Sequence, residues 1–158
     1  MKFKDRVAIV TGGARGIGKA IALAFSREGA RLALVDVDKE QLEVVKKQIE
    51  KGKSKVIAIP CDITKSSDVK EMVDQVRKGF GRIDILVNNA GIIRRGTIDT
   101  VTEEDWDRVI EVNLKGTFNC CKAVAEIMKS QKYGKIVNVS SIAGKMGDIT
   151  SAPGYGPS

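Results

Sequence analysis

Short apolar runs alternate along this chain with longer stretches in which apolar residues recur every three or four positions. The apolar runs cover residues 7–10, 32–35, 56–59, 83–87 and 136–139, and polar or glycine-containing turns follow them. Such runs, bounded by turn residues, are typical of strands that are buried on both faces. We therefore predict five buried β-strands at these positions.

The intervening stretches have the period of amphipathic helices. They predict four helices, over residues 17–25, 39–51, 66–79 and 102–132. We expect Ser66 or Ser67 to cap the third helix, and Thr102, with Asp105 three residues later, to begin the fourth. Gly29 is expected to end the first helix, since glycine is common just past a helix C-terminus.

Strands that alternate with helices form a parallel sheet with right-handed crossovers and helices on both faces. The doubly wound form of this α/β architecture has the strand order 3-2-1-4-5. It binds ligands beyond the carboxyl ends of the strands, at the switch point between strands 1 and 4. We expect one Rossmann-type domain over residues 1–158.

Composition and charge narrow the possible partners and mechanisms. The net charge is +7, but the basic residues are scattered among acidic ones, so we expect no nucleic-acid interface. No apolar run approaches the roughly 20 residues of a membrane span, so we expect no membrane partner. Cys61, Cys120 and Cys121 form no disulfide framework, which favours a reducing cytoplasm. The chain has no histidine, which excludes Ser-His-Asp and Cys-His catalysis within it and argues against a metal site.

The turn after the first strand is rich in glycine and leads into a helix. Such a turn presents backbone N–H groups at a helix N-terminus, where a diphosphate can bind. A side chain at these positions would block close approach of the backbone or forbid a positive φ. The candidate cofactor contacts here are Gly12, Arg15, Gly16, Ile17 and Gly18. The alternative is a turn whose glycines serve structure alone.

Acidic residues follow the second and third strands. A carboxylate at Asp36 can accept hydrogen bonds from adenosine ribose hydroxyls and would repel a 2′-phosphate, so we expect NAD in preference to NADP. Arg15 favours NADP instead, because an arginine can hold the 2′-phosphate. Asp62, with Ile63, ends the third strand and can meet the adenine amino group. The alternative for both carboxylates is an ordinary turn residue.

Two motifs together resemble the short-chain dehydrogenase/reductase family. One is the pattern T-G-x-x-x-G-x-G over residues 11–18, and the other is Asn88-Asn89-Ala90-Gly91 after the fourth strand. The resemblance implies an NAD(P)-dependent oxidoreductase that moves a hydride between nicotinamide and a carbonyl or secondary alcohol. It also implies that Asn89, Ala90 and Gly91 border the cofactor and that Asp62 lies at the adenine.

The resemblance further implies the proton chemistry. It assigns Tyr155 as the general acid/base, Ser141 as the group that polarises the substrate oxygen, and Asn113 as the anchor of a relay water. A kink at Asn113 could free a backbone carbonyl for that water. A free tyrosine has a pKa of about 10 and needs help at neutral pH. The family supplies a lysine four residues after the tyrosine, which would follow Ser158. Lys145, in the loop expected after the fifth strand, is not expected to replace it.

We therefore expect the chain to be the N-terminal two-thirds of a longer enzyme, and to be inactive alone. Residues 140–147 are most similar to 3-oxoacyl-[acyl-carrier-protein] reductases, and residues 89–95 also resemble sugar-acid dehydrogenases. Arg94 and Arg95 could meet a substrate carboxylate or an acidic carrier protein, or could be ordinary solvated charges. A non-catalytic dinucleotide-binding fragment is the alternative of another class.

The family is usually tetrameric, and the fourth predicted helix has an apolar stripe that agrees with a homotetramer or dimer. The stripe includes Phe118, Ala125 and Met128. It is equally compatible with packing of this helix on the sheet, so the sequence leaves the two interpretations open.

Overall fold

A five-stranded parallel sheet forms the centre of the computed structural model, which describes residues 1–52, 54–146 and 151–158. Its strands are β1 (Val7–Thr11), β2 (Arg31–Asp36), β3 (Val56–Pro60), β4 (Ile85–Asn88) and β5 (Lys135–Asn138). The order across the sheet is β3-β2-β1-β4-β5, and every neighbouring pair is parallel. The predicted doubly wound topology is confirmed.

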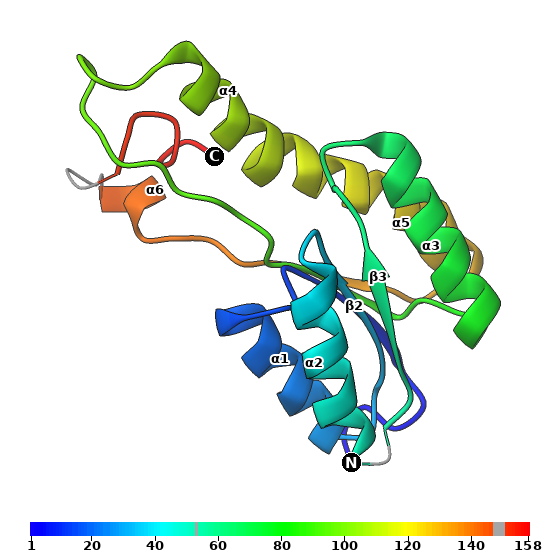
Figure 1. Ribbon diagram of the computed structural model, residues 1–158. Coiled ribbons are helices and arrows are strands. Elements are labelled where there is room, and N and C mark those ends of the chain that lie inside the picture. The colour runs from blue at the N-terminus through cyan, green and yellow to red at the C-terminus, as the bar shows by residue number, and fades with distance from the viewer. Residues whose placement is uncertain (53, 147–150) are drawn as a thin grey trace.

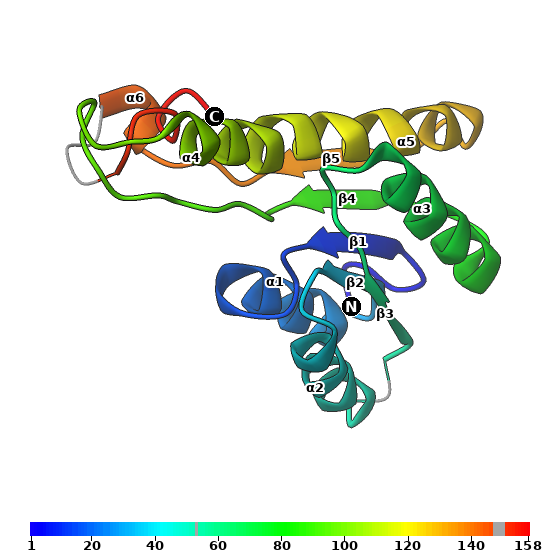
Figure 2. The ribbon, with the colours of Figure 1, turned by 45° about the horizontal axis from the view of Figure 1, so that its top comes forward.

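Helices cover both faces of this sheet (Figure 1). On one face lie α1 (Gly16–Arg27) and α2 (Lys39–Glu50), and on the other lie α3 (Ser66–Phe80) and α5 (Thr117–Ser130). Figure 2 shows the two helical layers on either side of the strands. Between β4 and α5 the chain forms α4 (Glu103–Ile110) and η1 (Glu111–Gly116), and the short α6 (Ala143–Met146) follows β5.

Strands β1, β2 and β4 are buried almost throughout because both faces of this part of the sheet are covered, whereas the edge strand β5, predicted to be buried, is exposed at all four of its residues. Side chains alternate between the faces of a strand. Thus Val7 and Ile9 pack with α3 and α5, whereas Ala8 and Val10 pack with α1 and α2, and all four are fully buried. The same burial explains why continuous apolar runs, rather than alternating ones, predicted the strands.

The long fourth helix of the prediction is interrupted in the structure. The predicted start is confirmed, because the Thr102 hydroxyl accepts a hydrogen bond from the Asp105 amide (3.1 Å). Six residues in the middle, Glu111–Gly116, form a π-helix that contains Asn113. The helical run therefore continues without a break from α4 to α5, but it is π-helical around Asn113, where a kink was predicted. Of the expected apolar stripe, Met128 packs in the core at 8% exposure, whereas Phe118 is 59% exposed.

Three local predictions are wrong. Helix α3 begins at Ser66 itself, and its N-cap is Lys65, which makes no capping hydrogen bond through its side chain. Strand β4 begins at Ile85 rather than at Ile83, because the backbone of Ile83 is bound by the side-chain amide of Gln131. Lys145 lies in α6 instead of a loop.

Candidate active site

The glycine turn after β1 needs glycine for two different reasons. Gly12 (φ +64°) and Gly16 (φ +53°) have positive φ angles, which L side chains rarely adopt. At Gly18, a Cβ atom would collide with the carbonyl of Gly12. A Cβ at Gly16 would meet nothing within 4 Å, so this side of the turn is open, and neighbouring Ile17 is 64% exposed. Among the described residues, no side chain caps the first amides of α1, whose N-cap is the exposed Arg15.

Thr11 joins the glycine turn to the turn after β4. Its buried hydroxyl accepts hydrogen bonds from the amides of Asn89 (3.0 Å) and Ala90 (3.1 Å) and donates one to the carbonyl of Val87 (3.3 Å). The Asn89 side chain adds donations to the carbonyls of Thr11 and Gly12. The two motifs quoted from the sequence are thus one structural unit. Sequence reasoning missed Thr11, although a threonine directly before the glycines was the available signal.

Asp36 connects the end of β2 to the glycine turn. One carboxylate oxygen accepts a hydrogen bond from the amide of Ala14 (3.2 Å), and the other accepts one from the amide of Asp38 (3.1 Å). An ionised carboxylate has about four acceptor sites, so this half-buried group keeps capacity for further donors.

Asp62 and Ile63 follow β3 and face different surroundings. Burial alone would raise the pKa of Asp62, but the hydrogen bonds from the Thr64 hydroxyl and amide, with the nearby Arg108 and Lys65 charges, lower it. The side chain of Ile63 is only 7% exposed and packs against Gly116. The apolar side chain of Ile63 therefore faces the core, and only its backbone can serve a ligand.

Asn113, on η1, holds the turn after β4 through a two-way hydrogen bond. Its Oδ1 accepts from the amide of Ile92 (2.8 Å), and its Nδ2 donates to the carbonyl of Ile92 (3.0 Å) and to the hydroxyl of Ser158 (3.0 Å). The backbone carbonyl of Asn113 accepts a hydrogen bond from the Thr117 hydroxyl (2.8 Å).

A cavity of about 520 Å³ gathers many of the predicted residues. Its walls come from the start of α1, from the turn after β4, from η1, from the end of β5 with the residues that follow it, and from the segment around Tyr155. It is lined by Ile17, Asn88, Asn89, Ala90, Gly91, Ile92, Ile93, Asn113, Leu114, Thr117, Asn138, Val139, Ser140, Ser141, Gly144, Tyr155, Gly156 and Ser158. The three predicted catalytic residues therefore line one cavity with the turn after β4. Gly12, Arg15, Gly16, Gly18, Asp36, Asp62 and Ile63 lie outside its lining.

Ser141 and Tyr155 approach this cavity from different segments. The Ser141 hydroxyl oxygen accepts a hydrogen bond from the Ala143 amide (3.2 Å) at the start of α6. Tyr155 is half-buried, and its carbonyl accepts a hydrogen bond from the Ser158 hydroxyl (2.9 Å). Lys145 is exposed and is not part of the cavity lining. Gly147, the last residue of the quoted 140–147 segment, lies outside the described residues.

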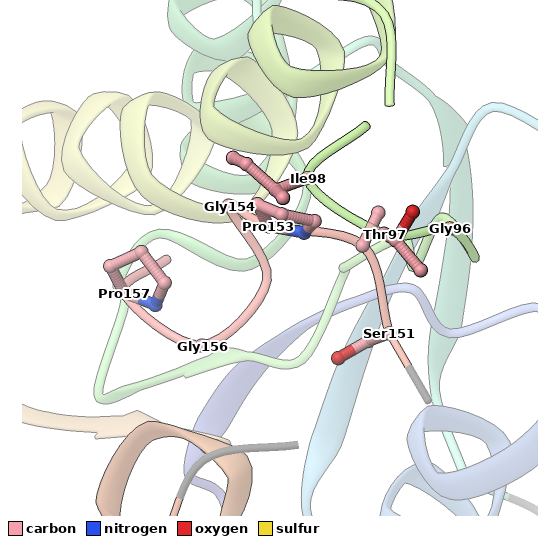
Figure 3. A pocket seen from close by; sticks show the side chains of 9 residues that line it. Gly96, Thr97, Ile98, Ser151, Pro153, Gly154, Gly156 and Pro157 are labelled. Atoms are coloured by element: carbon pink, nitrogen blue, oxygen red, sulfur yellow. The ribbon is translucent and has the colours of Figure 1, made fainter. Parts of the chain in front are cut away.

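Figure 3 shows a second cavity, of about 420 Å³. The loop after β4 and the residues on both sides of Tyr155 line it. It is lined by Gly96, Thr97, Ile98, Ser151, Ala152, Pro153, Gly154, Gly156 and Pro157. Gly156 belongs to both linings, so the two cavities adjoin there.

The loop arginines differ in their contacts. Arg94 forms an ion pair with Asp105 (2.9 Å), so its charge is used within the protein, and Arg95 is exposed. All three cysteines are free, and burial raises the pKa of both Cys61 and Cys120 to about 12. Those two thiols therefore stay protonated at neutral pH and are poor nucleophiles.

Among the described residues there is neither a cluster of three or more metal-ligating side chains nor a helix long and apolar enough to cross a membrane.

Comparison with known proteins gives a consistent result. A family model described as short chain dehydrogenase matches residues 6–158. The chain is 46% identical over 144 residues to an uncharacterized oxidoreductase of Mycobacterium bovis, covering 91% of this chain and 58% of that protein. It is 45% identical over 148 residues to a 3-oxoacyl-[acyl-carrier-protein] reductase of Thermotoga maritima, covering 94% and 60%.

Among solved structures, an NAD+-bound xylitol dehydrogenase superposes with a TM-score of 0.95 at 36% identity. That match covers 99% of this chain and 60% of the xylitol dehydrogenase chain. The chain thus spans about 60% of the length of the relatives it matches.

Proposed function

The chain belongs to the short-chain dehydrogenase family, and from that premise we propose that it forms the cofactor-binding and catalytic part of an NAD(P)-dependent oxidoreductase. The reaction interconverts a carbonyl compound and a secondary alcohol. One observation carries this proposal. Asn113, Ser141 and Tyr155 come from three separate segments, yet they line a single cavity together with the turn after β4.

The residues at the switch point fit a nicotinamide dinucleotide. The open side of the turn at Gly16 leaves room for a diphosphate beside the uncapped amides of α1. Asp36 would accept hydrogen bonds from the adenosine ribose hydroxyls, and Asn89–Gly91 would border the nicotinamide half. The bound cofactor supplies or accepts the hydride. We propose NAD as the preferred form because Asp36 would repel a 2′-phosphate, with exposed Arg15 as the feature that favours NADP.

The side chains in the cavity divide the proton chemistry among them. Tyr155 gives a proton to the substrate oxygen during reduction and removes it during oxidation. The Ser141 hydroxyl, whose oxygen accepts a hydrogen bond from the Ala143 amide, donates its proton to the same substrate oxygen in this proposal. Asn113 holds the wall at Ile92 in place, and we propose its backbone carbonyl as the anchor of a relay water.

We propose a 3-oxoacyl thioester as the substrate class, supported by the relationship to the Thermotoga maritima reductase. The lining of the second cavity agrees, because it is built of small residues with Ile98 and two prolines and carries no charged side chain among the described residues. Arg95 would face an acidic carrier protein. A sugar or polyol dehydrogenase is the second candidate, supported by the likeness to xylitol dehydrogenase.

The test uses the protein expressed from the complete reading frame. Oxidation of NADH and NADPH is followed with an acetoacetyl thioester, and reduction of NAD+ and NADP+ is followed with polyols and sugar acids. We expect Tyr155→Phe to lower kcat by about a thousandfold, as expected when a general acid/base is removed, with dinucleotide affinity changed by less than about twofold. Tyr133→Phe is the matched control, since Tyr133 is the only other tyrosine.

Two outcomes would contradict the proposal. If the protein binds a dinucleotide but turns over no carbonyl compound or alcohol, it is a dinucleotide-binding protein and not an oxidoreductase. Full activity of Tyr155→Phe would remove the assigned general acid/base.

A further inference from the structure

Tyr155 is flanked by two contacts with the same helical run. Gly154, just before it, packs against Trp106 of α4, and Ser158, three residues after it, is bound by Asn113 of η1. Trp106, on α4, and Asn113, on η1, belong to one continuous helical run. This run therefore holds the tyrosine segment on both sides of the tyrosine.

The contact at Gly154 leaves no spare room. A Cβ atom at this position would lie 3.0 Å from Cε3 of Trp106 and 3.4 Å from Cδ2 and Cζ3. The φ angle of Gly154 is +107°, which only glycine adopts readily. The backbone of Gly154 thus lies directly against the indole of Trp106, and Tyr155 is the next residue in the chain. Figure 3 shows Gly154 beside the loop residue Ile98, at the edge of the second cavity.

Hydrogen bonds fix the same segment along its length. The amide of Ala152 donates to the carbonyl of Arg94 (2.8 Å), and the side chain of Arg94 is paired with Asp105, the residue before Trp106. The Ser158 hydroxyl donates to the carbonyl of Tyr155. The Tyr155 amide also donates to the carbonyl of Ala152 (3.3 Å), so the turn that contains Gly154 is closed and moves as a unit. The indole of Trp106 is the group against which this turn rests.

We propose that Trp106 is a positioning residue for Tyr155, an inference that rests on the proposed function. The indole acts through Gly154 and sets how far the tyrosine hydroxyl reaches into the cavity. Displacement of a reacting group by about 1 Å can cost about a hundredfold in rate. The side chain suits this role because a large ring with two rotatable bonds offers a rigid surface.

The contact itself can be tested without turnover, because Trp106 is the only tryptophan in the sequence. Gly154→Ala places a methyl group against the indole and disfavours the positive φ, so the segment moves away. We expect a red-shifted emission and a roughly twofold increase in acrylamide quenching. Gly79→Ala is the matched control, since a Cβ there meets only Ile57, at an ordinary 3.8 Å. An unchanged spectrum for Gly154→Ala would overturn the contact.

The positioning role is tested by activity in the protein from the complete reading frame. We expect Trp106→Ala to lower kcat by about ten- to a hundredfold, to shift the pH at half-maximal kcat, and to change dinucleotide affinity by less than about twofold. Trp106→Phe, which keeps an aromatic surface, should recover kcat to within about threefold. Phe118→Ala, which removes an exposed aromatic ring from the same helical run, should leave kcat unchanged.

The outcomes separate this inference from the proposed function. If the unmodified protein turns over no substrate, the proposed function fails, and the fluorescence experiment still decides whether Gly154 rests on Trp106. If the unmodified protein is active but Trp106→Ala has the same kcat and pH profile per folded molecule, the positioning role is overturned. If Trp106→Ala does not fold, Trp106→Phe and Trp106→Leu take its place, and equal kcat and pH profiles in these two variants would overturn the role.

Discussion

The two ends of β4 carry buried polar side chains in opposite situations. At the amino end, the carboxylate of Asp84 is fully buried and accepts hydrogen bonds from Arg6 (2.9 Å), from two nitrogens of Arg82 (2.8 and 2.6 Å) and from the Val7 amide (3.0 Å). At the carboxyl end, Oδ1 of buried Asn88 has no hydrogen-bond partner among the described residues. Asn88 also belongs to the lining of the larger cavity.

This difference distinguishes a polar side chain that stabilises the fold, Asp84, from one that has hydrogen-bonding capacity left for a ligand, Asn88. Burial alone would raise the pKa of Asp84, but the hydrogen bonds from Arg82, Val7 and Arg6 outweigh burial and lower it. A group whose bonding capacity is used within the protein contributes to stability and has little left for a ligand. Polar groups at the carboxyl end retain capacity beside a cavity, so they can serve a ligand.

The largest effect is expected from breaking the amino end. Asp84→Ala leaves the Val7 amide without its acceptor and the two partly exposed arginines without their shared carboxylate, and it should lower the free energy of unfolding by about 2–3 kcal/mol. Urea denaturation followed by circular dichroism measures the loss. Asp74→Ala, which removes an exposed aspartate from α3, should change stability by less than about 0.5 kcal/mol. A loss below 1 kcal/mol for Asp84→Ala would show that this cluster is not the anchor we describe.

The contribution of Asp84 to stability should depend on pH. The pKa of Asp84 in the folded protein is below its ordinary value of 3.8, so its contribution to stability is complete above that pH. The contribution is lost as pH falls through the folded value, because the carboxylate must then be protonated. We expect the stability difference between the unmodified protein and Asp84→Asn to be constant from pH 7 to 5 and to shrink below pH 3.8. A difference that stays constant down to pH 2.5 would contradict this linkage.

A substitution of Thr11 tests whether a polar side chain beside the carboxyl end of β4 can also serve to stabilise the fold. Thr11→Val keeps the shape of the side chain but leaves the amides of Asn89 and Ala90 without their acceptor. We expect a loss of about 1–3 kcal/mol in the free energy of unfolding, with weaker dinucleotide binding because the two turns separate. Thr11→Ser retains the hydroxyl and should recover most of both losses. Equal stability of Thr11→Val and Thr11→Ser would contradict the role of the hydroxyl.

Asp36 should show the smallest effect on stability and a clear effect on the ligand. Asp36→Ala is expected to weaken NAD binding by about tenfold, equivalent to about 1.4 kcal/mol, and to reduce the preference over NADP. Isothermal titration with both dinucleotides measures this. Asp38→Ala is the control, since Asp38 accepts a hydrogen bond from the Gln41 amide at the start of α2 and should affect stability alone. An unchanged NAD/NADP ratio for Asp36→Ala would remove its proposed role.

Local patterns were sufficient to predict the sheet. The runs around Ile9, Leu34 and Leu86 are apolar because helices cover both faces of these strands. Each strand can therefore be recognised from consecutive apolar residues in the sequence. The glycine turn and the asparagine turn were recognisable for the same reason, since each motif is contiguous. Asn113 was predicted as a weak point of its helix, and the structure has a π-helical segment there.

Features that depend on distant partners could not be predicted. Asp84 is a single acidic residue after an isoleucine, and only the fold brings Arg6 beside it, 78 positions away. The start of β4 was placed two residues early because Gln131, from the end of the helical run, binds the backbone of Ile83. The packing of Gly154 on Trp106 likewise has no local signal, because the two residues lie on separate segments.

The π-helical segment also bears on how this chain tolerates changes in length. A π-helix accommodates one residue more per turn than an α-helix, and each residue of an α-helix advances the side chains by about 100°. Deleting one residue from Glu111–Gly116 would let the run become uniformly α-helical, and it would leave α4 and α5 close to their present relative rotation, because the wider π turn holds the extra residue. Trp106 would keep its place beside Gly154 and Val124 would still pack on the sheet, but the side chains of the π segment, Asn113 among them, would change position. A change of one residue in chain length at this segment is thus expected to disturb the cavity wall that Asn113 holds at Ile92, whereas the same deletion within α4 or α5 would turn every following side chain by about 100°.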